Sequence, residues 1–232
     1  EVSANTFQHL IEGSAALRAR VEAAGGQVRY TAYGYHGTEI LIDGRYQWQT
    51  YTNYTQGYAK MRLERIARAA WAQGVKATVY NCPEIRTNST DVFAGVELPL
   101  ISLLEALKKE GGGAWAEAQW QACRALLDEG VALEDVLRKL AAFHGSEVMQ
   151  AYRDFAAWPM PNSPAQADLQ IATSDEIVQL HKDRGALITD LLSGLVVEAT
   201  GALIFHESAA PAGPVLWLNH DIVARQLNAL HA

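Results

Sequence analysis

The first third of the chain changes from a helical to a strand-like hydrophobic pattern. Apolar residues recur three and four positions apart up to Gly25-Gly26, which predicts an N-terminal amphipathic helix. Beyond it, β-branched and aromatic residues alternate with polar ones, and Asp43-Gly44 is typical of a two-residue hairpin turn. We therefore expect a meander of three strands, then a helix and a fourth strand, over residues 27–35, 38–42, 45–52, 56–73 and 76–80.

The rest of the chain shows three further patterns. Residues 98–157 contain short amphipathic segments separated by glycines, which indicates a small helical lobe. Pro159, Pro161 and Pro164 cannot lie inside a helix, so 158–167 is expected to be an exposed linker without regular structure. Beyond it the pattern predicts a helix over 173–192 and three short strands over 196–199, 202–206 and 215–218. A last helix is expected from Asp221.

Together these elements predict an α+β fold. Its core is a helix–three-stranded antiparallel meander–helix unit, with an inserted small helical lobe and a second short C-terminal meander. The expected division is 1–97 for the lobe with the sheet, 98–157 for the helical lobe, 158–167 for the linker and 168–232 for an α/β segment that packs with the first lobe as one domain. No run approaches the ~18 consecutive apolar residues of a membrane helix, which indicates a soluble protein.

Charge and aromatic residues are distributed unevenly along the chain. The formal net charge is −7, yet residues 27–76 contain seven lysines and arginines against three carboxylates. The same segment contains seven of the nine tyrosines. An acidic protein of this kind is not a general polyanion binder, but it can hold a phosphate-bearing partner on its one basic segment.

The alternation of side chains in the predicted meander places apolar residues on one face and polar residues on the other. Arginine, glutamine and tyrosine on one face can stack on bases and contact phosphates, so we expect a non-catalytic binding or assembly protein that contacts nucleic acid through residues 27–76. The acidic helical lobe would contact another protein, and no membrane partner is expected. An ordinary solvated sheet is the alternative explanation of the polar face. The candidate binding residues are Arg29, Tyr33, Tyr35, Arg45, Gln47, Tyr51, Arg62 and Arg65.

Two catalytic candidates support a second hypothesis, a transferase- or hydrolase-type enzyme with a pocket between the lobes. Tyr35-His36-Gly37-Thr38 resembles the His-Gly-Thr element with which diphtheria-toxin-like and poly-ADP-ribosyl transferases bind nicotinamide. The resemblance covers four residues, and the hairpin signal at Asp43-Gly44 departs from the helix that follows in that family. Cys82 comes just after a predicted strand, where α/β proteins often place reactive groups.

The remaining candidate chemistry is sparse. The seven histidines form no pair at the helical i, i+4 spacing and none lies next to a cysteine, so no metal site is predicted and no cofactor is assigned. Cys82 and Cys123 are far apart in sequence, which argues against a disulfide framework and favours a cytoplasmic location.

Overall fold

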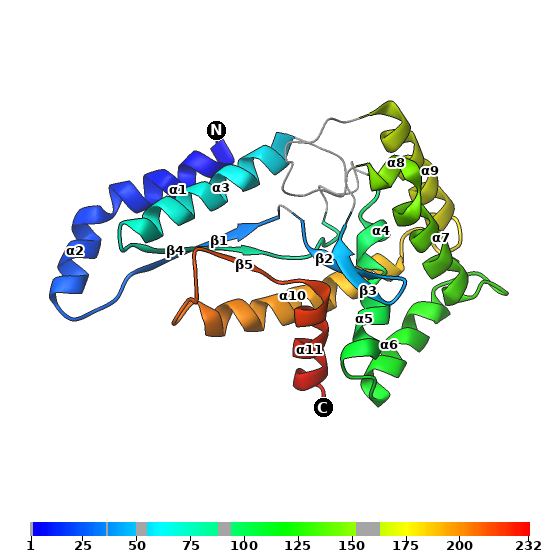
Figure 1. The fold of residues 1–232 in the computed structure, drawn as a ribbon. Coiled ribbons are helices and arrows are strands. Elements are labelled where there is room, and N and C mark those ends of the chain that lie inside the picture. Colours follow the sequence, from blue (N-terminus) through cyan, green and yellow to red (C-terminus); the bar gives the residue numbers. More distant parts are fainter. Residues whose placement is uncertain (1, 36, 50–54, 88–93, 152–162) are drawn as a thin grey trace. The chain divides into compact units, whose positions relative to one another are not determined.

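The computed structural model describes residues 2–35, 37–49, 55–87, 94–151 and 163–232 (Figure 1). The chain divides into two compact units, each built from segments that are separate in sequence. Unit 1 comprises residues 1–37, 54–82 and 201–218, and unit 2 comprises residues 38–53, 83–200 and 219–232.

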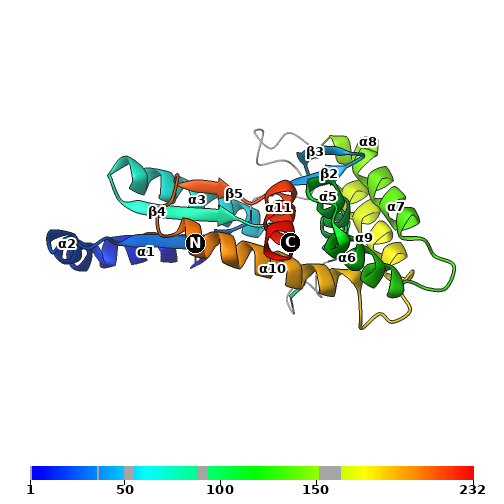
Figure 2. The same cartoon turned by 90° about the horizontal axis from the view of Figure 1, so that it is seen from below.

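Unit 1 contains a parallel sheet with α1 (Val2–Gly13) and α3 (Thr55–Ala72) on one face (Figure 1). Its other elements are α2 (Ala15–Ala23), β1 (Arg29–Gly34), β4 (Lys76–Asn81), the last turns of α10 (Ile188–Glu207) and β5 (Val215–Trp217). The strand order is β1-β4-β5, with both pairs parallel, so β4 lies in the middle (Figure 2). Helix α3 leads through Gly74 directly into β4, which makes β1, α3 and β4 a crossover unit.

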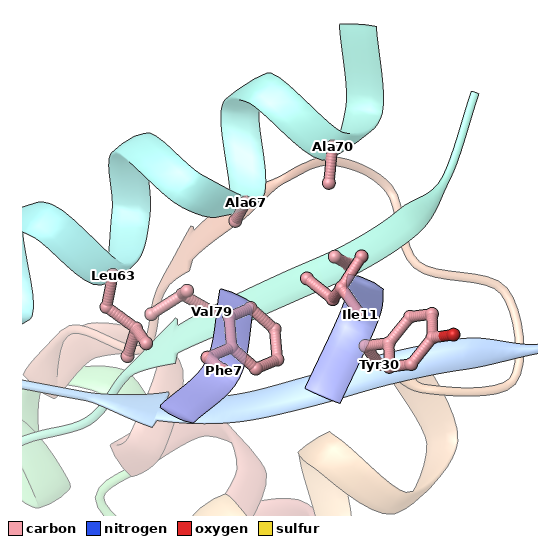
Figure 3. Packing of buried hydrophobic residues seen from close by; sticks show 8 residues of the cluster. Phe7, Ile11, Tyr30, Leu63, Ala67, Ala70 and Val79 are labelled. Atoms are coloured by element: carbon pink, nitrogen blue, oxygen red, sulfur yellow. The ribbon is translucent and has the colours of Figure 1, made fainter. Parts of the chain in front are cut away.

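The core of unit 1 forms where α1 and α3 cover this sheet (Figure 3). Phe7 and Ile11 of α1 and Leu63 of α3 pack against Tyr30 of β1 and Val79 of β4, all of them buried. Tyr30 and Val79 project to this face because strand side chains alternate. The alternation predicted for residues 28–33 is thus confirmed: Tyr30 is buried, whereas Tyr33, on the opposite face, is 63% exposed.

Unit 2 is mostly helical and holds a two-stranded hairpin. Its elements are β2 (Glu39–Ile42), β3 (Arg45–Trp48), α4 (Glu97–Leu100), α5 (Leu103–Glu110), α6 (Ala114–Ala125), α7 (Leu133–Gly145), α8 (Glu147–Gln150), α9 (Pro164–Val178), the first part of α10 and α11 (His220–Leu230). Asp43 and Gly44 both have positive φ, 48° and 72°, as the predicted hairpin turn requires. Leucines at helical spacing along α5 and α7 supply much of the buried core.

The predicted fold class is wrong in its strand pairing. Residues 29–34 do not join residues 39–48 in a meander; β1 pairs with β4 instead, and only β2 and β3 are antiparallel. The physical reason lies in β4, in which every residue from Ala77 to Asn81 is buried. A strand buried on both faces is typical of the middle of a parallel sheet.

The second predicted meander is also wrong. Residues 196–199 and 202–206, predicted as strands, lie within the single helix α10. Leu192, Val196 and Ala199 are buried at spacings of four and three, so helical periodicity overrides the strand propensity of the β-branched residues. Only the strand at residues 215–217 forms.

The predicted linker also needs correction. Pro164 occupies the first turn of α9, where a missing N–H costs nothing, so the predicted linker ends earlier than residue 167. Residues 158–162 of that linker lie outside the described residues, and the division into domains stays a prediction. Among the described helices, α10 alone is long and apolar enough to cross a membrane, but 44% of that window is buried, and the core helix of a soluble protein meets the same criteria.

Candidate functional site at the carboxyl edge of the parallel sheet

Three residues form a row across the carboxyl edge of the sheet in unit 1. Gly34 ends β1 and pairs in register with Asn81, which ends β4, and Asn81 pairs with Trp217, which ends β5. Backbone hydrogen bonds continue just beyond the row, from Cys82 N to Gly34 O (3.3 Å) and from Leu218 N to Asn81 O (2.8 Å). In open α/β sheets, ligands bind outside the carboxyl ends of the strands, so this edge is the candidate binding site of unit 1.

The absence of a side chain at position 34 shapes the edge. A Cβ atom on Gly34 would overlap Oδ1 of Asn81 and lie 2.7 Å from Cγ1 of Val79. Both neighbours are fully buried and cannot move aside without disturbing the sheet. Glycine at this position therefore lets the Asn81 side chain lie directly against the end of β1.

Asn81 is a buried amide with one half satisfied. Its Nδ2 donates a 3.0 Å hydrogen bond to Oε1 of Glu64, a buried carboxylate on α3. Its Oδ1 is buried and has no hydrogen-bond donor among the described residues. A buried acceptor without a donor is costly in a folded protein, and such atoms mark places where a ligand or water supplies the missing group.

Lys60 and Cys82 add a cation and a thiol to the same edge. Lys60 lies near the start of α3, and its Nζ donates to the backbone carbonyl of Tyr33 over 3.3 Å. Burial lowers the pKa of the Lys60 ammonium group, and the nearby Cys82 opposes that shift. Cys82 is half-buried directly after β4, the position predicted for it, and its thiol donates to Tyr80 O. A partly desolvated ammonium group at this edge is suited to contact an anionic ligand.

The predicted binding residues of unit 1 do not gather at this edge. Arg29 begins β1 at the opposite, amino edge, where it bonds Gln27 and helps line a hollow of about 360 Å³. Tyr33 is exposed on β1, and Tyr35 is half-buried just past Gly34. Arg62 and Arg65 are exposed on α3.

The other predicted residues do not share a sheet with these. Arg45 and Gln47 lie on β3, which pairs with β2 in unit 2, so the expected continuous polar face of three strands does not exist. His36 and Tyr51 lie outside the described residues.

Sequence reasoning missed Gly34, Lys60, Glu64 and Asn81. A usable signal was present, because Gly34 and Asn81 each follow a run of strand formers. Recognising the two strands as parallel neighbours would have brought the residues to one edge.

A second polar cluster, in unit 2, is internally satisfied. The Tyr46 hydroxyl donates to Oε1 of Glu110 over 2.7 Å, and Arg225 binds both Oε2 of Glu110 (2.8 Å) and Asp221. Burial and the hydrogen bond to Glu110 raise the pKa of Tyr46, while the Tyr46 hydroxyl lowers the pKa of Glu110. The described residues include no group of three or more His, Cys, Asp or Glu that could hold a metal ion. This cluster therefore joins β3, α5 and α11 within unit 2.

Comparison with known proteins gives one family. The family model described as enoyl-acyl carrier protein reductase FabMG matches residues 1–227. A solved structure described as an apo form of FabMG, a novel type of enoyl-acyl carrier protein reductase, is 69% identical with a TM-score of 0.95, and an NADH-bound form is 61% identical with a TM-score of 0.83. Each match covers 99% of this chain, but only 52% and 55% of the solved chains, so this chain spans about half their length. A search of curated proteins found no match.

These matches overturn the leading functional hypothesis. The matched proteins are enzymes, which contradicts a non-catalytic binding protein and leaves the nucleic-acid interpretation of residues 27–76 without support. The enzyme alternative is the better one, although the matched proteins are reductases and neither transferases nor hydrolases.

Proposed function

The chain belongs to the FabMG family of enoyl-acyl carrier protein reductases, and we propose that it reduces the carbon–carbon double bond of an enoyl thioester, using NADH. NADH supplies a hydride to one carbon of the double bond, and a proton adds to the other, which yields the saturated thioester and NAD⁺. The observation that carries the proposal is the β1–α3–β4 unit, with Gly34 and Asn81 at its carboxyl edge, in a chain 61% identical to an NADH-bound protein.

The residues at this edge fit a dinucleotide. In dinucleotide-binding folds, a glycine after the first strand allows close approach of the ligand, and a polar residue at the end of the next strand bonds a ribose hydroxyl. Gly34 and Asn81 occupy these two positions. The unsatisfied Oδ1 of Asn81 is an acceptor of the kind that a ribose hydroxyl or carboxamide N–H fills.

Glu64 and Lys60 then each have a definite task. Glu64 orients Asn81 through the 3.0 Å hydrogen bond to Nδ2, which leaves Oδ1 as the acceptor. Lys60 would supply positive charge beside the end of β1 toward the phosphate groups of the cofactor. We further propose a cytoplasmic location, since the two cysteines form no disulfide and the proposed cofactor is an intracellular metabolite.

The experiment is a titration of the protein with NADH, followed by fluorescence, and an assay of NADH oxidation in the presence of crotonyl-CoA. We expect saturable NADH binding and a saturated thioester product identified by mass spectrometry. Asn81→Leu, which keeps the branching of the side chain but is larger and removes both the Oδ1 acceptor and the Nδ2 donor to Glu64, should weaken NADH binding by about tenfold or more. Thr31→Val, at an exposed position on β1, is the control. If the protein neither binds NADH nor oxidises it with crotonyl-CoA, the proposed function is wrong.

A further inference from the structure

A groove of about 570 Å³ runs between α1 and α3 in unit 1, on the helical layer visible in Figure 1. Its floor is apolar, formed by Ile11 of α1 and by Met61 and Ile66 of α3. On the α3 side the rim is formed by Arg62 and Arg65. On the α1 side it is formed by Gln8 and Glu12, which hydrogen-bond to each other over 2.7 Å.

The arginines on the exposed side of α3, two of them on the rim, have no carboxylate partner among the residues that the structure describes. Arg62, Arg65 and Arg68 are exposed at three-residue spacing along α3, and no ion pair joins any of them to a carboxylate within the described parts of the chain. The contact that Arg65 does make is with Sδ of Met61, at 3.7 Å. Glu64, which precedes Arg65 in the sequence, is buried, and its carboxylate accepts a hydrogen bond from Asn81.

An apolar floor with two arginines on its α3 rim and the Gln8–Glu12 pair on its α1 rim suits one kind of occupant, an amphipathic helix whose acidic face lies on the α3 side. The apolar side chains of such a helix would cover Ile11 and Ile66, and its carboxylates would meet Arg62 and Arg65. Because the protein carries a net charge of −7, an acidic partner is repelled elsewhere and is steered to this local positive surface.

We propose that this groove docks an acidic helix of the acyl carrier protein that delivers the enoyl thioester. The inference rests on the proposed function, which names the carrier, and on the position of the groove along α3. Lys60, which reaches the carboxyl edge of the sheet, precedes Arg65 by five residues, a rise of about 7.5 Å along a helix. A carrier bound at the rim therefore lies next to the edge proposed to hold NADH.

The test compares two substrates that differ in the carrier alone, crotonyl-acyl carrier protein and crotonyl-CoA. The double variant Arg62→Glu, Arg65→Glu should raise KM for the carrier-linked substrate by about tenfold or more, with kcat and the KM for crotonyl-CoA unchanged. Direct titration with the holo-carrier should show the same loss of affinity. Raising the salt concentration should weaken wild-type binding more than binding by the variant.

Two single controls each carry the charge change of one rim substitution, so Arg62→Glu and Arg65→Glu are also measured singly for comparison. Arg68→Glu lies on α3 but outside the groove lining, and Arg124→Glu lies on the exposed surface of α6 in unit 2. Both should affect carrier binding less than either rim substitution, and a thermal melt should show that all variants are folded.

Three outcomes would overturn the proposal: the rim variant binds the carrier as wild type does, the controls lose as much affinity as the rim variant, or wild type fails to bind the carrier at low salt. An enzyme that reduces crotonyl-CoA but shows one of these results keeps the proposed function and loses the docking site. If wild type reduces neither substrate, the proposed function fails, and the carrier titration still decides the docking site.

Discussion

The arginines of the two units differ in what they contact. In unit 2, Arg86 makes two hydrogen bonds to Asp190, at 2.9 and 2.8 Å, and Arg225 bridges Glu110 and Asp221. In unit 1, the arginines along α3 face solvent without a carboxylate partner among the described residues. Paired charges within a unit stabilise its fold, whereas uncompensated charges at one surface favour a partner. The first set therefore supports the fold of unit 2, and the second set includes Arg62 and Arg65, the two arginines of the proposed docking groove.

Truncation of a core side chain in unit 2 should have the largest effect on stability and no effect on NADH binding. Leu140 of α7 is 2% exposed, and Leu140→Ala removes buried methyl groups from a packed site. We expect a loss of about 2–5 kcal/mol in the free energy of unfolding, with unchanged NADH affinity for the folded protein. Urea denaturation and NADH titration measure the two quantities. An unaltered unfolding midpoint would mean that Leu140 does not contribute to the core.

A substitution at Gly34 should cost less stability than Leu140→Ala but should weaken NADH binding directly. Gly34→Ala introduces a Cβ that overlaps Asn81 Oδ1, so Asn81 must move and its hydrogen bond to Glu64 is strained. We expect a loss of stability of about 1–3 kcal/mol and a clear loss of NADH affinity. Gly13→Ala is the matched control, because a Cβ at the end of α1 meets nothing within 4 Å. Equal NADH affinity in both variants would remove Gly34 from the site.

The pH dependence of stability should report on unit 2. His220 is buried beside Ser102, and burial, with a smaller contribution from His144, lowers its pKa from 6.5 to about 3. The folded protein therefore binds fewer protons than the unfolded chain between these values, and its stability falls as the pH drops below 6.5. At pH 5 this single group should cost about 2 kcal/mol relative to pH 7.5.

Urea unfolding of wild type, His220→Gln and the exposed-site control His206→Gln at the two pH values isolates this contribution. The His220 variant should lose about 2 kcal/mol of the pH dependence, and the control should keep it. The same pH dependence in all three proteins would show that His220 is not held neutral.

The smallest predicted effect is the difference in stability between a substitution of Arg86 in unit 2 and one of Arg62 in unit 1. Arg86→Ala breaks the paired contact with Asp190, which is partly exposed, and should cost about 0.5–1 kcal/mol. Arg62→Ala breaks no ion pair among the described residues and should leave stability unchanged within a few tenths of a kcal/mol. Thermal melts of the two variants make the comparison. A larger cost for Arg62→Ala would indicate that this arginine supports the fold.

Local elements were largely predictable from the sequence, and their pairing was not. The hairpin at Asp43-Gly44 and helix α3 follow from turn chemistry and hydrophobic period alone. The parallel pairing of β1 with β4 depends on a contact across α3 and the inserted hairpin, and local alternation carries no information about such a partner. The site shares this limit, because Gly34 and Asn81 become neighbours only through that register.

The same limit applies to the candidate functional residues. Features that depend on one element were predictable, and features that depend on strand pairing were not. The position of Cys82 at the end of a strand was predictable because it depends on one element. The basic, tyrosine-rich character of residues 27–76 was also visible, but its assignment to nucleic acid assumed a single sheet. With β1 and β3 in separate sheets, composition alone could not indicate which residues would act together.

The order of strands in unit 1 has a consequence for synthesis on the ribosome. Strands β1 and β4 emerge early, but β5, which covers the second edge of β4, is made more than 130 residues later. Until then the nascent chain displays the edge of a strand rich in strand-forming residues, Thr78, Val79 and Tyr80, which can pair with a neighbouring chain. Productive folding of this unit therefore depends on protecting β4 during elongation, and slowed translation before residue 215 should increase aggregation.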